Sequence, residues 1–114
     1  MFSIVELNRY FFADSGNSCT RTEEARTQVE KLKAKGVDAI IAVTHMGIEN
    51  ENNIPDTGMR DVINAVDGID VVIAGHMHKD VPSEIIKNTL ITEPHRYGTQ
   101  SFPLSFIQRR VYVI

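Results

Sequence analysis

Two short apolar runs constrain the fold more than any other feature of the sequence. They cover residues 37–44 and 69–74, and each has the length of a single strand. Runs without polar alternation are typical of strands buried on both faces of a parallel sheet. The segment between them has apolar residues spaced as on one face of a helix: Met59, Val62, Ile63 and Val66. The pattern predicts a strand–helix–strand unit with a right-handed crossover, hence a parallel α/β core.

Capping signals mark the starts of two helices. Before the first apolar run, a helix is expected over about residues 21–35. Thr20 and Glu23 have the spacing of a capping box, in which each side chain accepts a hydrogen bond from the other residue's backbone. Lysines gather near the expected end of this helix, where cations are favoured. For the helix between the two strands, Asp56 or Thr57 is the expected N-cap.

The C-terminal part of the sequence predicts a further secondary-structure element, whereas the N-terminal part predicts none. Residues 84–93 are expected to form a β-hairpin around Lys87-Asn88, after the parallel core. Residues 1–21 are treated as an atypical N-terminal segment without an assigned element, and residues 22–114 as the domain segment that carries the expected core. The length allows one ordinary domain with its own core.

Histidines follow both apolar runs directly. His45 follows the first run, and Gly75-His76-Met77-His78 follows the second. In parallel α/β sheets, functional groups gather beyond the carboxyl ends of the strands, so three imidazoles are expected at one sheet edge. If the chain stays extended through Met77, His76 and His78 project the same way. Imidazole is a common metal ligand, and the pattern therefore predicts a metal site.

At these residues the sequence resembles the calcineurin-like metallophosphoesterases. The segments Thr44-His45-Met46-Gly47 and Ala74-Gly75-His76-Met77-His78 are similar to the last two motifs of that family, in the branch of bacterial 5'-nucleotidases and 2',3'-cyclic-nucleotide phosphodiesterases. The resemblance implies an α/β fold that is half of a four-layer αββα domain, with a parallel βαβ core followed by the hairpin. This chain would be the C-terminal half of the catalytic domain.

The resemblance also implies a binuclear metal centre. By position, His45 and His76 would share one metal ion, and His78 would bind the second. The ions could be Zn, Mn, Fe or Ni, since imidazole suits all four. The implied substrate is a nucleotide or another phosphoester, and His95 and Arg96 could contact its phosphate.

Several motifs of the family are missing from the sequence. They are an Asp-x-His, a Gly-Asp-x-x-Asp that bridges the metals, and an Asn-His that protonates the leaving group; no histidine precedes His45. We therefore assign no catalytic residue to this chain and expect it to be inactive alone. A complementary half-domain or a second copy would be needed for hydrolysis.

Two other interpretations remain open at this point. The chain could be a non-catalytic metal-binding or oligomerisation module, or a generic parallel α/β domain whose histidines bind nothing. Glu49 and Glu51 could reach a metal or the residues behind its ligands, although an ordinary exposed loop is the favoured interpretation for them.

Charge and hydropathy argue against some partners, but they do not determine the compartment of the protein. The formal net charge of −3 argues against nucleic acid as an electrostatic partner. No apolar run reaches the roughly 18 residues that would span a membrane, and no signal peptide is recognisable. As written the chain would stay in the cytoplasm, whereas the family it resembles is often periplasmic or extracellular, so the compartment is left unknown.

Overall fold

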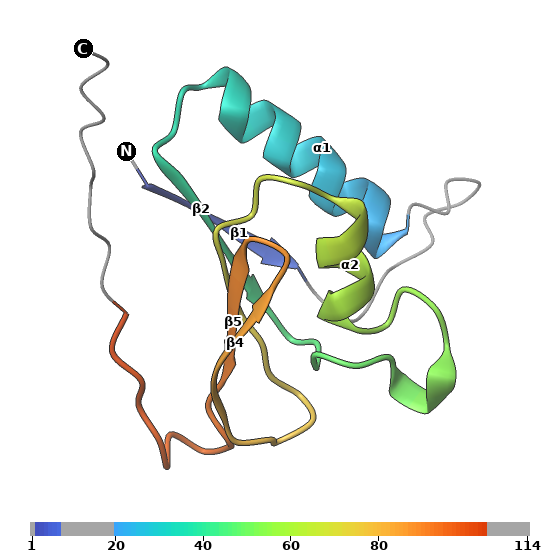
Figure 1. Ribbon diagram of the computed structural model, residues 1–114, viewed down its shortest axis with the longest axis vertical. Coiled ribbons are helices and arrows are strands. Elements are labelled where there is room, and N and C mark those ends of the chain that lie inside the picture. The colour runs from blue at the N-terminus through green and yellow to red at the C-terminus, as the bar shows by residue number, and fades with distance from the viewer. Residues whose placement is uncertain (1, 8–19, 105–114) are drawn as a thin grey trace.

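The fold is built on one five-stranded sheet with the strand order β1-β2-β3-β5-β4 (Figure 1). The computed structural model describes residues 2–7 and 20–104. Four strands are parallel: β1 (Phe2–Leu7), β2 (Ala39–Thr44), β3 (Val71–Ile73) and β5 (Thr89–Glu93). The remaining strand, β4 (Val81–Ile86), pairs antiparallel with β5. The predicted parallel βαβ core and the closing hairpin are both confirmed.

Strand β1 is an addition to the expected architecture. It lies at the edge of the sheet and pairs parallel with β2, with Ile4 opposite Ile41. The sequence analysis assigned no element to this segment, because its apolar run is short and soon interrupted by polar residues. Pairing with an already buried strand stabilises such a run, and this tertiary effect has no local signal.

Helix α1 (Arg21–Ala34) begins with the predicted capping box. The Thr20 hydroxyl accepts a hydrogen bond from the Glu23 backbone N–H at 3.1 Å, and the Glu23 carboxylate accepts one from the Thr20 N–H at 2.9 Å. These bonds satisfy two donors that a helix start would otherwise leave without partners.

Helix α2 (Met59–Ala65) begins later than the sequence indicates. Its N-cap is Gly58, so the expectation that Asp56 or Thr57 caps this helix is wrong. Asp56 has a left-handed backbone with a φ of 65°, which turns its side chain away from α2. Asparagine and aspartate tolerate this conformation better than other non-glycine residues.

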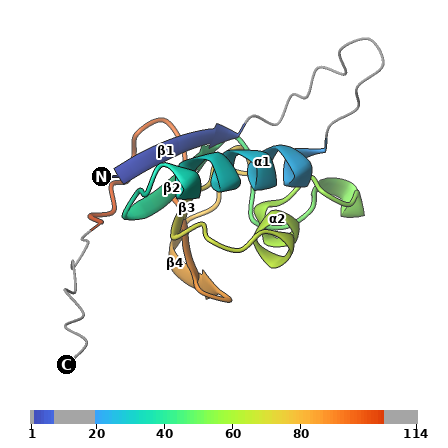
Figure 2. The ribbon, with the colours of Figure 1, turned by 90° about the horizontal axis from the view of Figure 1, so that it is seen from above.

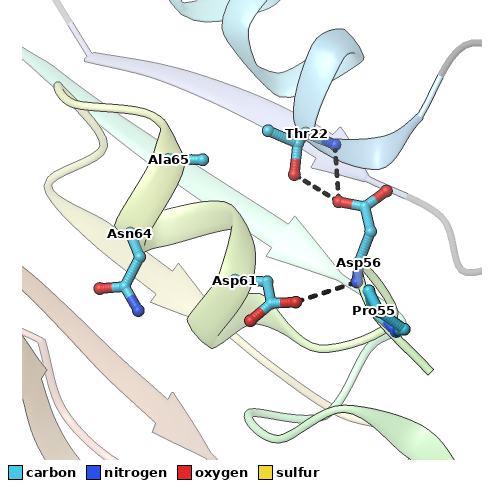
Figure 3. Close-up of a pocket in the computed structure, with 6 residues that line it drawn as sticks. All are labelled: Thr22, Pro55, Asp56, Asp61, Asn64 and Ala65. Carbon is cyan, nitrogen blue, oxygen red and sulfur yellow. Dashed lines mark hydrogen bonds between the residues drawn. The ribbon is translucent and has the colours of Figure 1, made fainter. Parts of the chain in front are cut away.

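Asp56 instead caps α1, far away in the sequence. Its carboxylate accepts a hydrogen bond from the backbone N–H of Arg21 at 2.8 Å. It also accepts hydrogen bonds from the backbone N–H of Thr22 at 3.1 Å and from the Thr22 hydroxyl (Figure 3). Its own backbone N–H donates to Asp61 in α2 at 3.0 Å. Thr22, Asp56 and Asp61 line a shallow pocket where the two helices meet, and both carboxylates already accept hydrogen bonds from the protein.

Both helices pack on one face of the sheet (Figure 2). Paired residues of neighbouring parallel strands share a face, and alternate residues face opposite sides. The helix-covered face carries Ala42, Val72 and Ile91, which are aligned in the register and fully buried. The core that this face forms with the helices includes Val29, Met46, Met59, Val62 and Ile63.

Candidate metal centre

The two histidine segments leave the sheet at the same edge. Strands β2 and β3 are parallel neighbours, with Val43 opposite Ile73 near their carboxyl ends. His45 follows β2 directly, and the segment that carries His76 and His78 follows β3. Parallel pairing therefore brings side chains together that are far apart in the sequence.

Backbone contacts hold the two segments side by side. The Gly75 N–H donates to the Met46 carbonyl at 2.9 Å, and Met46 is fully buried beneath them. Gly47 lies against the Met77 side chain so closely that a Cβ at position 47 would be 2.4 Å from the Met77 Cγ. An alanine at position 47 would therefore displace the Met77 side chain, which is 41% exposed.

His45 and His76 form a pair. The Nε2 atom of His45 lies 3.1 Å from the Nδ1 atom of His76, and the ring centroids are 5.0 Å apart. Of the His76 side chain, 22% is exposed, so the pair is accessible from the surface. The two nitrogens are within hydrogen-bond distance, and the tautomers of the two rings decide which nitrogen donates.

The chain does not stay extended through Met77, so this expectation is wrong. His76 has a φ of 74°, and the Met77 N–H donates to the Gly75 carbonyl at 2.9 Å. This geometry is that of a classic γ-turn, a rare and strained conformation. His78 also has a positive φ, of 55°. Turns, and not strand alternation, determine where these two imidazoles point.

His78 is not brought to the other two histidines. Its ring lies 5.9 Å from that of Tyr97, in the segment after β5. Within residues 2–7 and 20–104, no group of three or more His, Cys, Asp or Glu side chains is arranged to hold a metal ion. The structure thus joins two of the three predicted ligands, and the metal-binding role of all three stays a prediction.

Glu51 faces the second nitrogen of His76. Its Oε2 atom lies 3.5 Å from the His76 Nε2, on the opposite side of the ring from His45. The short 3₁₀ helix η1 (Glu51–Asn53) carries it, and the Glu51 backbone N–H donates to the Thr57 hydroxyl at 2.8 Å. The sequence analysis favoured an exposed loop here, since nothing in the Asn-rich composition indicates which carboxylate turns inward.

Glu93 is a functional candidate that the sequence analysis missed. It is the last residue of β5 and is 0% exposed. Its Oε1 atom accepts a hydrogen bond from the Lys79 backbone N–H at 3.3 Å. Burial raises the pKa of Glu93, while hydrogen bonding from the Lys79 backbone opposes this shift. The sequence pattern of residues 84–93 predicts only a hairpin strand that ends at Glu93, and a glutamate at such a position is usually exposed.

The predicted phosphate contacts, His95 and Arg96, follow β5 at the same edge of the sheet. The Arg96 guanidinium carbon lies 5.3 Å from the centroid of the Tyr97 ring, which in turn neighbours His78. Tyr97 is 85% exposed, so this cluster is on the surface. Substrate binding by His95 and Arg96 stays a prediction.

The His45–His76 pair fits two positions around one divalent ion. Histidine nitrogens bind zinc at about 2.0–2.1 Å, which in a tetrahedral site separates two of them by roughly 3.4 Å. The observed 3.1 Å between Nε2 and Nδ1 is close to this value. A glutamate behind a histidine ligand is also a common arrangement, because it orients the ring. Further ligands would be needed to complete such a site.

Comparison with known proteins gives the class of the chain. The fold is similar to that of a 5'-nucleotidase from Staphylococcus aureus crystallised with alpha-ketoglutarate, with a TM-score of 0.56 and 20% identity over 69% of this chain and 17% of that one. In sequence, the chain is 38% identical over 63 residues to the trifunctional nucleotide phosphoesterase protein YfkN of Bacillus subtilis (strain 168). It is 39% identical over 70 residues to the endonuclease YhcR of the same organism. The predicted resemblance to calcineurin-like phosphoesterases is therefore confirmed.

More particularly, the chain belongs to the family of bacterial capsule synthesis proteins PGA_cap, whose model matches residues 6–92. The matches to YfkN and YhcR cover 54% and 60% of this chain but only 4% and 6% of those proteins. The chain thus corresponds to a small part of its curated relatives. In the portion of the chain that the structure describes, no helix is both long and apolar enough to cross a membrane.

Proposed function

We propose that the chain contributes to a metal-dependent phosphoester hydrolase centre, with His45 and His76 as two ligands of one divalent ion and His78 as a ligand of a second. The observation that carries this proposal is the 3.1 Å separation of the His45 and His76 nitrogens at the carboxyl edge of the sheet. Membership of a phosphoesterase-type family supports it.

Each residue has a defined role in this proposal. When bound, divalent ions would lower the pKa of a coordinated water and bind phosphate oxygens. His45 and His76 would bind as neutral imidazoles, and Glu51 would orient the His76 ring through its other nitrogen. Arg96, through its cationic guanidinium group, would attract the phosphate of the substrate at the rim.

The proposed substrate is a nucleotide, either a 5'-monophosphate or a cyclic nucleotide. The support is the similarity of the chain to a trifunctional nucleotide phosphoesterase protein and of its fold to that of a 5'-nucleotidase. The ion could be Zn, Mn, Fe or Ni. The proposal includes that a longer protein, a complementary half-domain or a second copy supplies the remaining ligands and the general acid.

A non-catalytic metal-binding module is the second candidate. The observation that favours it is the donor set: the described residues bring two imidazoles together but contain no group of three or more His, Cys, Asp or Glu side chains arranged to hold one ion. Such a pair can hold one ion without being able to hydrolyse a phosphoester.

Metal binding and hydrolysis should be measured together. The purified chain is titrated with Zn²⁺ and Mn²⁺, and hydrolysis of bis-p-nitrophenyl phosphate is followed in the same samples. We expect saturable binding that His45→Ala and His76→Ala each weaken at least about tenfold, with His95→Ala as the matched control. No binding would contradict both candidates. Because other parts would supply the remaining ligands and the general acid, the chain alone should bind metal without turnover. Turnover that appears when a complementary half-domain is added would favour the hydrolase, and its absence in that mixture would favour the module.

A further inference from the structure

Glu93 has an environment that a structural role alone does not explain. Its side chain is completely buried, and its Oε2 atom has no hydrogen-bond partner. Removing a carboxylate from water costs several kcal/mol unless a charge or hydrogen bonds compensate for it. The hydrogen bond from the Lys79 N–H to the Glu93 Oε1 is long at 3.3 Å, and the backbone of Met77 also donates to this carboxylate. This carboxylate therefore has unused capacity to interact with a positive charge.

The carboxylate lies beneath the segment that carries His76 and His78. Lys79, whose N–H donates to Glu93, directly follows His78. At the other end of the same segment, the Ala74 N–H donates to the carbonyl of Thr92, the residue before Glu93, at 2.8 Å. The last two residues of β5 thus hold the histidine segment at both of its ends.

We propose that Glu93 is a positioning residue for the histidine segment 74–79, and that its buried negative charge also favours a cation bound by His76. This inference rests on the proposed metal centre and adds a residue to it. The positive φ angles of both histidines are the strain that such a support has to offset.

Replacing Glu93 with glutamine tests the effect of its charge without changing the shape of the side chain. A glutamine has the same shape and keeps an oxygen that can accept from the Lys79 N–H, but it has no charge. If Glu93 were needed only for packing, this substitution would change neither the Zn²⁺ affinity nor the melting temperature. If the charge serves a cation, Glu93→Gln weakens Zn²⁺ binding by about 10- to 100-fold, the usual effect of changing a group behind the ligands.

Without metal, the same substitution should not lower the melting temperature, since it removes a buried charge that lacks full compensation. This second readout distinguishes a lost cation interaction from a damaged fold. Asp80→Asn is the matched control, because Asp80 is an exposed carboxylate one residue from Lys79. It removes the same charge from nearly the same place, and we expect a change in Zn²⁺ affinity of less than about threefold.

The experiment compares the full chain with Glu93→Gln, Glu93→Ala and Asp80→Asn. Zn²⁺ affinity is measured by calorimetry, and hydrogen exchange of the Lys79 amide is measured without metal. Weaker Zn²⁺ binding in Glu93→Gln alone supports the inference, and a Glu93→Gln affinity within about threefold of the original chain overturns it.

The experiment distinguishes a failure of the proposed metal centre from a failure of the role inferred for Glu93. If the original chain binds no Zn²⁺, the metal centre is refuted, and exchange of the Lys79 amide decides the positioning role by itself. About tenfold faster exchange in Glu93→Ala supports that role, since the amide then loses its acceptor. Unchanged exchange overturns it. If Glu93→Ala does not fold, the same comparison is made with Glu93→Gln, whose weaker neutral acceptor should still speed exchange.

Discussion

Asp56 joins the two helices, and replacing it with alanine should be strongly destabilising. The substitution removes the acceptor of two backbone N–H groups at the start of α1, those of Arg21 and Thr22. Loss of a helix cap of this kind costs about 0.5–2 kcal/mol. Alanine must also adopt the left-handed φ of 65°, which costs roughly another 1–2 kcal/mol. We expect the free energy of unfolding to fall by about 1.5–4 kcal/mol, the sum of these two effects.

Urea unfolding followed by circular dichroism measures this change. Asp56→Asn is the informative control, because asparagine keeps an acceptor oxygen and tolerates the left-handed conformation. It should lose no more than about half as much stability as Asp56→Ala. Glu30→Ala, at an exposed position of the same helix, should be nearly neutral. If the free energy of unfolding of Asp56→Ala is within about 0.5 kcal/mol of that of the original chain, Asp56 does not stabilise the start of α1.

Three further predictions follow from packing and charge. Gly58→Ala should destabilise by about 1–3 kcal/mol in urea unfolding, because the new Cβ would lie 2.3 Å from the Glu49 backbone carbon; an unchanged midpoint would contradict this. Ile91→Ala should lose about 2–5 kcal/mol in the same assay, since it leaves a cavity at a fully buried position. A hydrogen bond from the Asp56 backbone N–H lowers the pKa of Asp61 below its ordinary value of 3.8. The ionised Asp61 carboxylate therefore stabilises the fold above pH 3.8, and this stabilisation is lost as the pH falls through the lower pKa of the folded state. Asp61→Asn should therefore be less stable than the original chain near pH 7, and the difference should shrink in acid; a constant difference would refute this origin.

The core could be predicted because its signals are local and repeated. The apolar runs at 37–44 and 69–74 and the apolar spacing between them require a parallel βαβ unit, which the structure contains. The capping box of Thr20 and Glu23 is likewise complete within four residues. Strand β1 was missed because only its pairing with β2 stabilises it, and the sequence of the strand itself does not record that contact.

The candidate site was predictable only in part, for a related reason. Parallel strands that both end in histidine explain why His45 and His76 meet, and this follows from topology. The γ-turn at His76 depends on the packing of two loops, so no local rule indicates it. Glu51 and Glu93 acquire their roles from partners distant in the sequence, and each resembles an ordinary polar residue within its own segment.

The most direct test of the proposed metal centre is nitrogen NMR of the histidine side chains during a Zn²⁺ titration. We expect the Nε2 signal of His45 and the Nδ1 signal of His76 to shift together as one equivalent binds, because these two atoms face each other at 3.1 Å. The His95 signals should stay unchanged at the same ratio. A shift confined to one of the paired histidines, or an equal response of His95, would contradict a shared metal ion.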